Sequence, residues 1–257
     1  MKAIHVEQVD VAVGTKQILH KIDFHVQEGE FFGLIGPNGS GKSTLIKAIA
    51  NLQQTKEGNI QVHEIPQKTF SNKELAKFIS YVPQETVVGF DFNAMDVVKM
   101  GRHAYGSLFK NDTKQDEAIV RWAMEQTDTV HLMNRSIQSL SGGQRQLVMI
   151  AKALAQDTPI ILLDEPISAL DVYYQLKILT MLQSLCAQGK TIIIVLHDLN
   201  LASRFCHKLM ILNEGKIQKL GTPEEVLTQN TLKNIYHIDA YIDRNTHMEC
   251  VTVTPFL

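Results

Sequence analysis

The chain has 257 residues, of which 44% are hydrophobic and 20% charged, a composition typical of a globular protein with a substantial core. Lysine and arginine total 25 against 27 acidic residues, so the net charge is −2 and no basic excess favours a nucleic-acid partner. Cys186, Cys206 and Cys250 lack paired spacing, which disfavours a disulfide framework or a zinc site and predicts small buried side chains in a reducing compartment.

Neither the N-terminus nor any apolar run predicts a membrane segment. The first residues, MKAIHVEQVD, lack the basic and apolar regions of a signal peptide. Strongly apolar runs such as IIIVL at 192–196 are far shorter than the roughly 20 residues that cross a bilayer. If the protein works at a membrane, we therefore expect it to act from one side.

The first thirty residues predict antiparallel strands. Ile18, Ile22, Phe24 and Val26 recur with a period of two, which indicates one buried face. The later runs FFGLIG, ISYVP, IILLD and TIIIVLH are short and continuously apolar, as in strands covered on both faces. Because helical segments separate these runs, we expect a parallel α/β sheet.

Residues 83–159 carry few strand signals and predict a helical insertion within the α/β core. AMDVVKMG is helical in pattern, with Gly101 placed to end the helix. In DTKQDEAIVRWAMEQ, Asp112 and Gln115 have the spacing of a capping box. A further helix is expected over 141–156.

Two features are expected after the insertion. KLMILNEGKIQKLG predicts a hairpin that turns at Glu214–Gly215. The last twenty or so residues carry no recognisable chemistry.

GPNGSGKST at 36–44 fits the phosphate-loop pattern G-x-x-x-x-G-K-[ST], between the strand FFGLI and the helical STLIKAIANL. Its backbone N–H groups and the following helix N-terminus suit phosphate oxygens. Lys42 is expected to reach the β- and γ-phosphates, and the Ser43 hydroxyl to bind Mg²⁺. A glycine turn beside a surface lysine is the plain alternative. The expected nucleotide-binding residues are Gly36, Pro37, Asn38, Gly39, Ser40, Gly41, Lys42, Ser43 and Thr44.

IILLDEP ends a buried strand in Asp164 and Glu165, at the edge where an α/β sheet exposes its carboxyl ends to ligands. Asp164 suits Mg²⁺, and Glu165 suits a general base that accepts the proton of an attacking water. The alternative is a pair of solvated acids at a strand end. TIIIVLHD places His197 after another buried strand, where a histidine can hydrogen-bond a γ-phosphate and orient the water.

LSGGQ at 140–144 predicts a second anion site. Ser141 is expected to cap a helix, and Gly142 and Gly143 leave its first amide groups open. The motif lies in the helical insertion, away from the sheet edge that carries the phosphate loop. The simplest arrangement is that two copies meet, each closing LSGGQ over ATP held by Lys42 of the other.

In their order, GPNGSGKST, LSGGQ, IILLDEP, SALD at 168–171 and His197 resemble the ATP-binding-cassette (ABC) ATPases. The resemblance covers nearly the whole chain and implies one ABC transporter ATP-binding domain over 1–257. The implied fold class is α/β: a P-loop NTPase (RecA-like) core at about 1–85 and 157–257, with an antiparallel β subdomain and an inserted α-helical subdomain at about 86–156. In that family two cassettes clamp two ATP molecules head to tail.

The resemblance also assigns roles to further residues. Gln84 in YVPQE matches the Q-loop glutamine, which touches Mg²⁺ and water and relays motion to a membrane subunit, and Asp171 matches the D-loop aspartate at the dimer seam. Family members usually stack an aromatic residue on adenine where this chain has Val13, which leaves the contact to the base open. The implied catalytic residues are Lys42, Gln84, Glu165 and His197; the contacts across the dimer are Ser141, Gly142, Gly143, Gln144 and Asp171; the metal ligands are Ser43, Gln84 and Asp164.

HDLNLASRFC, LAQDTPIILLDEP, GRHAYGSLF and GTPEEVLT are similar to the motor of type II importers for ferric siderophores, haem or cobalamin. The partners that this implies are a second copy, integral membrane permease subunits and, indirectly, an extracytoplasmic substrate-binding protein, with the chain peripheral on the cytoplasmic face of the membrane. Residues 86–109 would then hold the groove for the permease's coupling helix. A soluble ABC ATPase without transport, such as an iron–sulfur assembly partner, is the alternative. A P-loop small-molecule kinase is a weaker alternative, because it has no use for LSGGQ.

Overall fold

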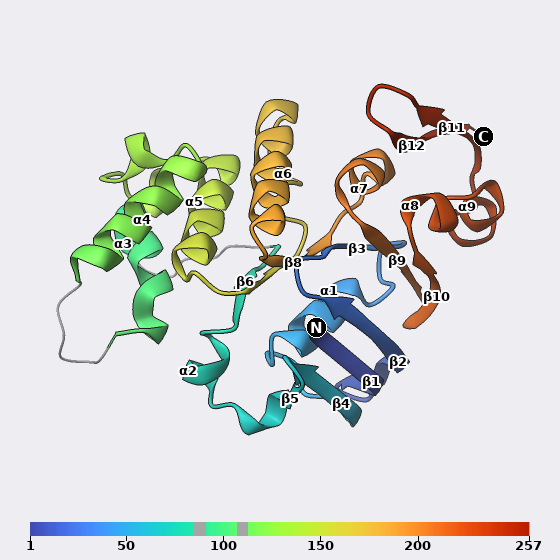
Figure 1. Cartoon of the computed structure of the whole chain (residues 1–257), viewed down its shortest axis with the longest axis horizontal. Coiled ribbons are helices and arrows are strands. Elements are labelled where there is room, and N and C mark those ends of the chain that lie inside the picture. The colour runs from blue at the N-terminus through green and yellow to red at the C-terminus, as the bar shows by residue number, and fades with distance from the viewer. Residues whose placement is uncertain (85–90, 107–112, 257) are drawn as a thin grey trace. The chain divides into compact units, whose positions relative to one another are not determined.

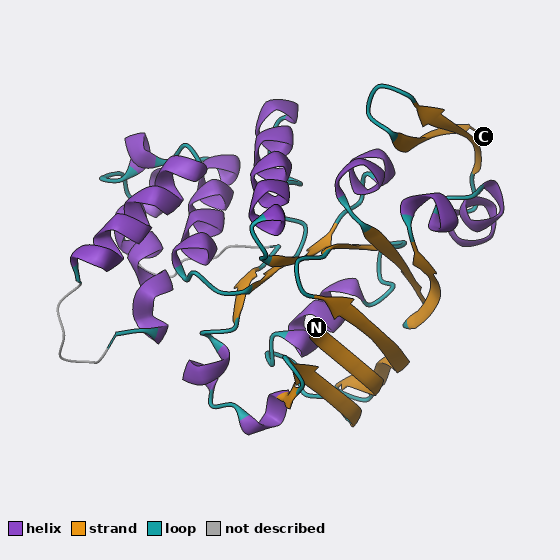
Figure 2. Cartoon of the chain, in the orientation of Figure 1, coloured by secondary structure: helices purple, strands orange, loops and turns teal. Residues whose placement is uncertain are grey.

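The computed structural model describes residues 1–84, 91–106 and 113–256. They form two compact units, one made of Met1–Thr69 with Cys186–Leu257 and the other of Phe70–Leu185. Figures 1 and 2 show that most strands belong to the first unit and the longest helices to the second. The mixture of parallel and antiparallel strands with helices confirms the predicted α/β class.

The first unit contains ten complete strands of the described chain and four of its helices. The strands are β1 (Lys2–Val13), β2 (Lys16–Gln27), β3 (Phe31–Ile35), β4 (Glu57–Val62), β5 (Ile65–Pro66), β8 (Thr191–Val195), β9 (Lys208–Asn213), β10 (Lys216–Gly221), β11 (Asp239–Asn245) and β12 (Cys250–Phe256). The helices are α1 (Lys42–Ile49), α7 (Leu199–Phe205), α8 (Pro223–Val226) and α9 (Gln229–Tyr236).

The N-terminal strands form the expected antiparallel sheet, in the order β2-β1-β4-β5. Ile22, Phe24 and Val26 are buried as predicted, but the prediction for Ile18 is wrong, because Leu19 is the buried residue there. The pairing of β1 with β2 shifts its register just before Ile22, and this bulge reverses the alternation of the side chains.

Four strands of the first unit lie in the order β10-β9-β3-β8, and two of them, β3 and β8, lead into the phosphate loop and the loop of His197. β3 is wholly buried and pairs in parallel with both β8 and β9, as its continuous apolar run predicts. β9 and β10 form the predicted hairpin, in which Glu214 and Gly215 have φ angles of 48° and 70°. All three cysteines are buried, in agreement with their expected role as small apolar side chains.

The second unit pairs β6 (Ile79–Val82) and β7 (Ile160–Leu163) in parallel. Its helices α3 (Ala94–Lys99), α4 (Lys114–Gln126) and α5 (Gly142–Ala155) pack together, and Figure 1 shows them side by side in green to yellow-green. The described helices of this unit are α2 (Asn72–Leu75), α3 (Ala94–Lys99), α4 (Lys114–Gln126), α5 (Gly142–Ala155) and α6 (Val172–Ala187), which ends at the boundary with the first unit. The narrower subdomain boundaries expected from the sequence, about 86–156 for the helical part, remain a prediction.

Two local predictions in this unit are wrong. The capping box of α4 joins Thr113 and Asp116, not Asp112 and Gln115; Asp112 itself lies outside the described residues. Gly101 does not end a helix, because α3 ends at Lys99 and continues as a 3₁₀ turn over Met100–Ala104. The helix expected from Ser141 to about Gln156 is confirmed, with Ser141 as its N-cap.

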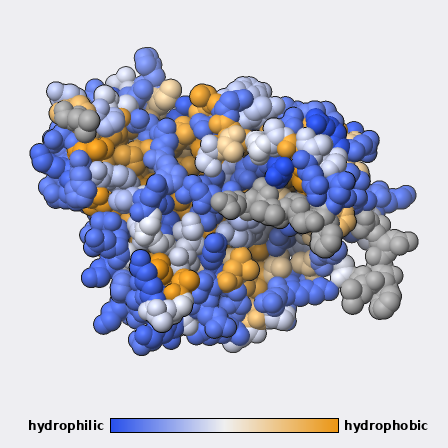
Figure 3. Space-filling model, turned by 180° about the vertical axis from the view of Figure 1, so that it is seen from behind, coloured by the Kyte–Doolittle hydropathy of each residue, from blue (hydrophilic) through white to orange (hydrophobic). Residues whose placement is uncertain are grey.

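No helix in the described part of the chain is long and apolar enough to span a membrane. On the face shown in Figure 3, hydrophobic residues gather in small patches among hydrophilic ones.

Candidate nucleotide-binding and catalytic site

The loop between β3 and α1 has the backbone geometry of a phosphate cradle. Gly36 has φ of 143°, and a Cβ atom there would lie 2.0 Å from the Leu212 carbonyl oxygen, so that only glycine fits. Gly39 and Gly41 also have positive φ, 76° and 105°. The loop therefore curls directly before the N-terminus of α1, where N–H groups are available to an anion.

Lys42 lies inside this loop. Its side chain is buried, with the residue only 5% exposed, and its Nζ donates to the Gly36 and Pro37 carbonyl oxygens at 2.8 and 2.9 Å. The buried Ser40 Oγ has no hydrogen-bond partner among the described residues. A buried polar atom without a partner is costly, so the cradle is suited to a bound group that would supply one.

His197 follows the strand beside the one that leads into the phosphate loop. β8 pairs in parallel with β3, so the carboxyl ends of both strands lie at the same edge. His197 is exposed, and Asp198 caps the next helix by accepting hydrogen bonds from the Asn200 and Leu201 amides at 2.8 and 2.9 Å. The structure thus brings the loop of His197 and the phosphate loop to one edge of the first unit.

The second unit carries the acidic residues at the ends of its own pair of parallel strands. Asp164 follows β7, is 1% exposed, and its amide donates to the Val82 carbonyl of β6 at 2.9 Å. Glu165 is half-buried with φ of 51°. Gln84, just beyond β6, donates from Nε2 to Glu165 Oε2 at 2.7 Å. The predicted Q-loop glutamine and the predicted general base are therefore in direct contact.

Tyr81 on β6 is a residue of this region that the sequence did not single out. Burial raises its pKa to about 12, and the nearby Asp164 carboxylate adds to the effect. Its hydroxyl is buried without a hydrogen-bond partner among the described residues. Tyr81 therefore keeps its proton and remains a hydrogen-bond donor.

The LSGGQ segment forms the N-terminus of α5 through a capping box. The Ser141 Oγ accepts from the Gln144 amide at 3.3 Å, and the Gln144 Oε1 accepts from the Ser141 amide at 3.2 Å. A Cβ on Gly143 would lie 3.0 Å from the Ala169 carbonyl oxygen, whereas one on Gly142 would meet open space. Gly143 thus permits close approach of the SALD segment, and Gly142 leaves the helix end accessible.

Together these segments line a pocket of about 400 Å³ within the second unit. Its walls are Asp128, His131, Leu132, Ser141, Gly143, Gln144, Leu147, Ala169, Leu170, Asp171 and Tyr174. The two acids in it already have partners: Asp171 caps α6 by accepting from the Tyr174 amide at 3.0 Å, and Lys177 lies 3.3 Å from the Asp128 carboxylate. An anion at the helix end therefore faces carboxylates whose charge is partly offset.

Three further residues near the functional loops were also missed. In the first unit, Asp198 and Asn200 flank the start of α7, and Tyr236 at the end of α9 hydrogen-bonds the Gly36 backbone. Burial raises the pKa of the Tyr236 phenol, an effect larger than the opposing one of that hydrogen bond. The HDLN run contained a signal for Asp198, which precedes a helix as caps do. No local pattern marked Tyr236 or Tyr81.

The oxygen ligands expected for Mg²⁺ fit that ion. A hydroxyl (Ser43), an amide (Gln84) and a buried carboxylate (Asp164) are hard donors, and Mg²⁺ at nucleotide sites takes few protein ligands and keeps several waters. The buried Tyr81 hydroxyl, whose pKa the Asp164 carboxylate helps to raise, has no hydrogen-bond partner among the described residues and could donate to a water. Among the described residues, no cluster of three or more His, Cys, Asp or Glu side chains could hold a metal by itself.

The phosphate cradle and the strand-end acids define the class of protein: a P-loop nucleotide hydrolase. The family model for ABC transporters matches residues 19–168, so the chain belongs to that family and is an ATP hydrolase of the ABC type. The fold is that of a P-loop NTPase, as predicted.

Known relatives agree with this assignment. The chain is 38% identical to the iron(3+)-hydroxamate import ATP-binding protein FhuC of Bacillus subtilis, over 94% of this chain and 90% of the relative. It is 36% identical to the hemin import ATP-binding protein HmuV of Shewanella denitrificans, over 92% and 94%.

Two solved structures are similar. One is an inward-facing ABC transporter of metal-chelate type, with a TM-score of 0.85, 28% identity, and coverage of 100% of this chain and 98% of that one. The other is the dimeric bacterial ABC transporter cassette MJ0796, with a TM-score of 0.78, 29% identity, and coverage of 86% and 98%.

Proposed function

We propose that two copies of this chain bind two ATP molecules head to tail, each nucleotide held by the phosphate loop of one copy and the LSGGQ helix of the other. The observation that carries the proposal is the pocket beside Ser141 and Asp171, an anion-receptive helix end in the second unit, whereas the phosphate loop belongs wholly to the first. A single bound nucleotide would not require two anion-binding helix ends, those of α1 and α5, from the same chain. The similarity to a dimeric cassette supports the arrangement.

The residues of each copy divide the chemistry between them. Lys42 leaves its loop carbonyls for the β- and γ-phosphates, which are stronger acceptors for an ammonium group. Glu165 accepts the proton of the attacking water while Gln84 fixes the orientation of its carboxylate. His197 hydrogen-bonds the γ-phosphate. In the partner copy, Ser141 and the amides of α5 receive the same phosphate.

Mg²⁺ is the cofactor that this donor set suits, with Ser43, Gln84 and Asp164 as its protein ligands. When bound, the ion neutralises charge on the phosphate oxygens. ATP hydrolysis that survives exhaustive chelation of divalent ions would reject this part of the proposal.

The work that hydrolysis drives is import through a separate membrane permease, with the chain attached to the cytoplasmic face through that permease. The substrate class that we propose is an iron chelate (ferric siderophore or haem) or cobalamin, delivered by an extracytoplasmic binding protein. Support comes from the HDLN continuation after β8 and from the named import roles of FhuC and HmuV. A soluble ABC ATPase without transport is not favoured, because these relatives are import subunits.

A groove on the helical part of the second unit is the surface that we propose for the permease. It has a volume of about 400 Å³ and is lined by Met95, Lys114, Glu117, Ala118, Val120, Arg121, Met124, Val130 and Met133. Methionine side chains adapt to the surface of an incoming helix, and the charged residues form a polar rim. The groove expected at 86–109 overlaps it only at Met95, and residues 85–90 and 107–112 lie outside the described chain.

Purification of the tagged chain from membranes, followed by mass spectrometry of co-purifying proteins, tests the import function. We expect integral permease subunits at a stoichiometry near one per copy. Met95→Glu should remove them while leaving basal ATP hydrolysis intact, and Met248→Glu, at an exposed hairpin turn, is the matched control. Recovery of soluble partners alone would contradict the proposal.

A further inference from the structure

The C-terminal hairpin, β11 and β12, packs against α7, the helix that follows His197, and one asparagine of that helix hydrogen-bonds it. The Asn200 Nδ2 donates to the Val253 carbonyl at 3.1 Å, and the Val253 amide donates to Asn200 Oδ1 at 2.7 Å. The side-chain amide thus pairs with both backbone groups of Val253, as a neighbouring strand would. Because both bonds come from one planar amide, they fix β12 and the first turn of α7 against each other in orientation as well as distance.

This attachment lies three residues from His197. On one side of the histidine, the Leu196 amide donates to the Leu34 carbonyl of β3 at 3.2 Å. On the other side, Asp198 caps α7 through the Asn200 and Leu201 amides. Asn200 therefore belongs both to the capped turn and to the contact with β12.

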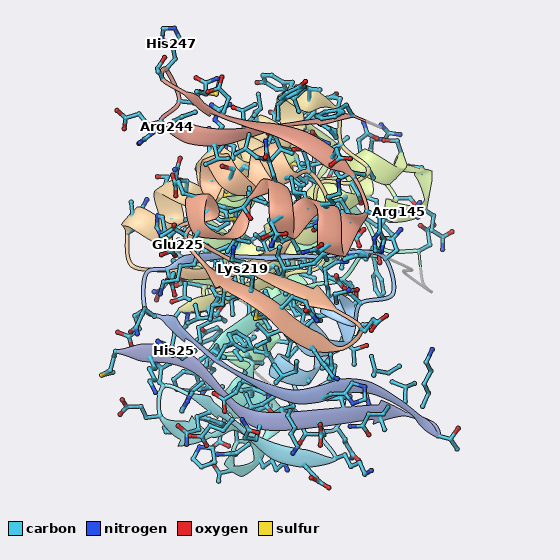
Figure 4. The ribbon with its side chains drawn as sticks, turned by 90° about the vertical axis from the view of Figure 1, so that its right-hand side faces the viewer. His25, Arg145, Lys219, Glu225, Arg244 and His247 are labelled. Atoms are coloured by element: carbon cyan, nitrogen blue, oxygen red, sulfur yellow. The ribbon has the colours of Figure 1, made fainter. Side chains whose placement is uncertain are left out.

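The same C-terminal segment also reaches the other nucleotide loop of this unit. Tyr236, just before the hairpin, hydrogen-bonds the Gly36 backbone at the start of the phosphate loop. The opposite end of the hairpin makes no such contribution: in Figure 4 its turn, marked by Arg244 and His247, stands clear of the helices below it, and His247 points away. Apart from the pairing of its own two strands, the hairpin packs most closely against α7, the helix that follows His197.

We propose that Asn200 is a positioning residue for His197, and that the hairpin of residues 239–256 holds it in place through Val253, so that ATP hydrolysis requires the docked hairpin. The proposal rests on the proposed role of His197. The C-terminal segment and Asn200 of the HDLN run would thereby have a function in hydrolysis. Neither belongs to the motifs whose roles are known.

The test is a double-mutant cycle in the full chain, measured as kcat and KM for Mg²⁺–ATP. Asn200→Ala should lower kcat about tenfold, the scale of a misplaced catalytic group, and change KM less than about twofold. His197→Ala should lower kcat further. Because Asn200 acts through His197, the double variant should be no slower than His197→Ala within about twofold.

Hydrogen exchange at the Val253 amide reports the docking of the hairpin directly. In Asn200→Ala, exchange there should accelerate by about tenfold or more, because its acceptor is lost. Asn200→Asp keeps that acceptor but loses the donor to the Val253 carbonyl, so its kcat should lie between those of the parent and the alanine variant. Asn234→Ala, whose side chain donates to Asn230 Oδ1 in the described part of the chain, is the matched control and should leave kcat unchanged.

Four outcomes would overturn the inference. An unchanged kcat in Asn200→Ala, with faster Val253 exchange, would show that docking does not matter for hydrolysis. Effects that multiply in the double variant would show that Asn200 acts elsewhere. Unchanged exchange would show that Asn200 does not hold the hairpin. Finally, a His197→Ala variant that keeps the parent kcat would show that the proposed role of His197 is wrong, and this inference, which rests on that role, would be wrong too. The single variant is enough to recognise this case. If Asn200→Ala does not fold, the aspartate variant decides the question through kcat: an unchanged kcat, or an effect that multiplies with that of His197→Ala, would overturn the inference.

Discussion

The Gln84 side-chain amide donates a hydrogen bond of 2.7 Å to the Glu165 carboxylate across 81 residues of sequence. The two side chains meet because β6 and β7 are adjacent parallel strands and each residue follows the end of its strand. A hydrogen bond to a carboxylate is stronger than one between neutral groups, so Gln84 holds Glu165 in one orientation. A displacement of Gln84 would therefore alter the proposed general base directly.

Glu165→Gln should keep ATP binding but slow hydrolysis by about 100-fold or more, since an amide cannot accept the proton of the attacking water. The substitution is isosteric, so the contact with Gln84 can persist in part. Steady-state turnover and equilibrium binding of a fluorescent ATP analogue are the measurements. Glu224→Gln, an exposed glutamate in α8, is the control. Turnover at the parent rate would remove Glu165 from the mechanism.

Ser141→Arg should abolish ATP-dependent dimerisation and hydrolysis while leaving ATP binding to the monomer nearly unchanged. Arginine would fill the pocket at the N-terminus of α5 and place a cation at the positive end of the helix dipole. Dimer formation is measured by size exclusion, with Glu165→Gln present to keep ATP intact.

The control for this substitution is Ser71→Arg. Ser71 caps α2 with the same reciprocal capping box but does not line the LSGGQ pocket. The Ser71→Arg variant should form ATP-dependent dimers as the parent does. Loss of ATP binding in the Ser141→Arg monomer would mean that both glycine-rich sites serve one nucleotide in one chain, and the two-copy arrangement would be rejected.

Val13→Tyr should tighten ATP binding by about 0.5–1.5 kcal/mol if the new ring stacks on adenine. Val13 ends β1 with 51% of its surface exposed, and Gly14 turns the chain directly after it, so a ring has room there. Val13→Leu enlarges the side chain without a ring and should have little effect. Equal ATP affinities for the parent and the tyrosine variant would show that another residue covers the base.

Asp116→Asn should destabilise the chain at neutral pH by about 1–3 kcal/mol. The Thr113 hydroxyl hydrogen bond, followed by the one from Arg102, holds the pKa of Asp116 below its usual value. A folded-state pKa below that of the unfolded chain contributes stability above the unfolded value, about 3.9, and this contribution is lost as the pH falls through the folded value.

The free energy of unfolding in urea, compared between parent and variant at pH 7 and near pH 3.5, checks this prediction. The difference should be largest at pH 7 and shrink at the acid end. Asp243→Asn, an exposed carboxylate on β11, should show little difference at either pH. A gap for Asp116→Asn that stays constant with pH would contradict the assigned cause.

Features whose chemistry lies within one short segment could be predicted from the amino-acid sequence. The phosphate loop is contiguous, and its glycines fix their own conformations; Asp164 and Glu165 follow a strand whose continuous apolar run signals burial on both faces; Ser141 caps a helix that begins at the next residue. Even so, two local predictions were wrong where neighbouring residues fit the same pattern. Thr113 and Asp116 outcompete the neighbouring capping pair, and a bulge exchanges the faces of Ile18 and Leu19.

The relationships between segments depend on the tertiary structure, because pairing of strands and packing of helices are set by the whole chain. The contact of Gln84 with Glu165, the pocket that SALD and LSGGQ line together, and the bond of Asn200 to Val253 join residues far apart in sequence. For each of these residues, the adjacent sequence does not indicate which distant residue it contacts. An asparagine side chain can pair with the free backbone N–H and C=O groups of any strand edge. Only the tertiary structure shows that Asn200 pairs with β12.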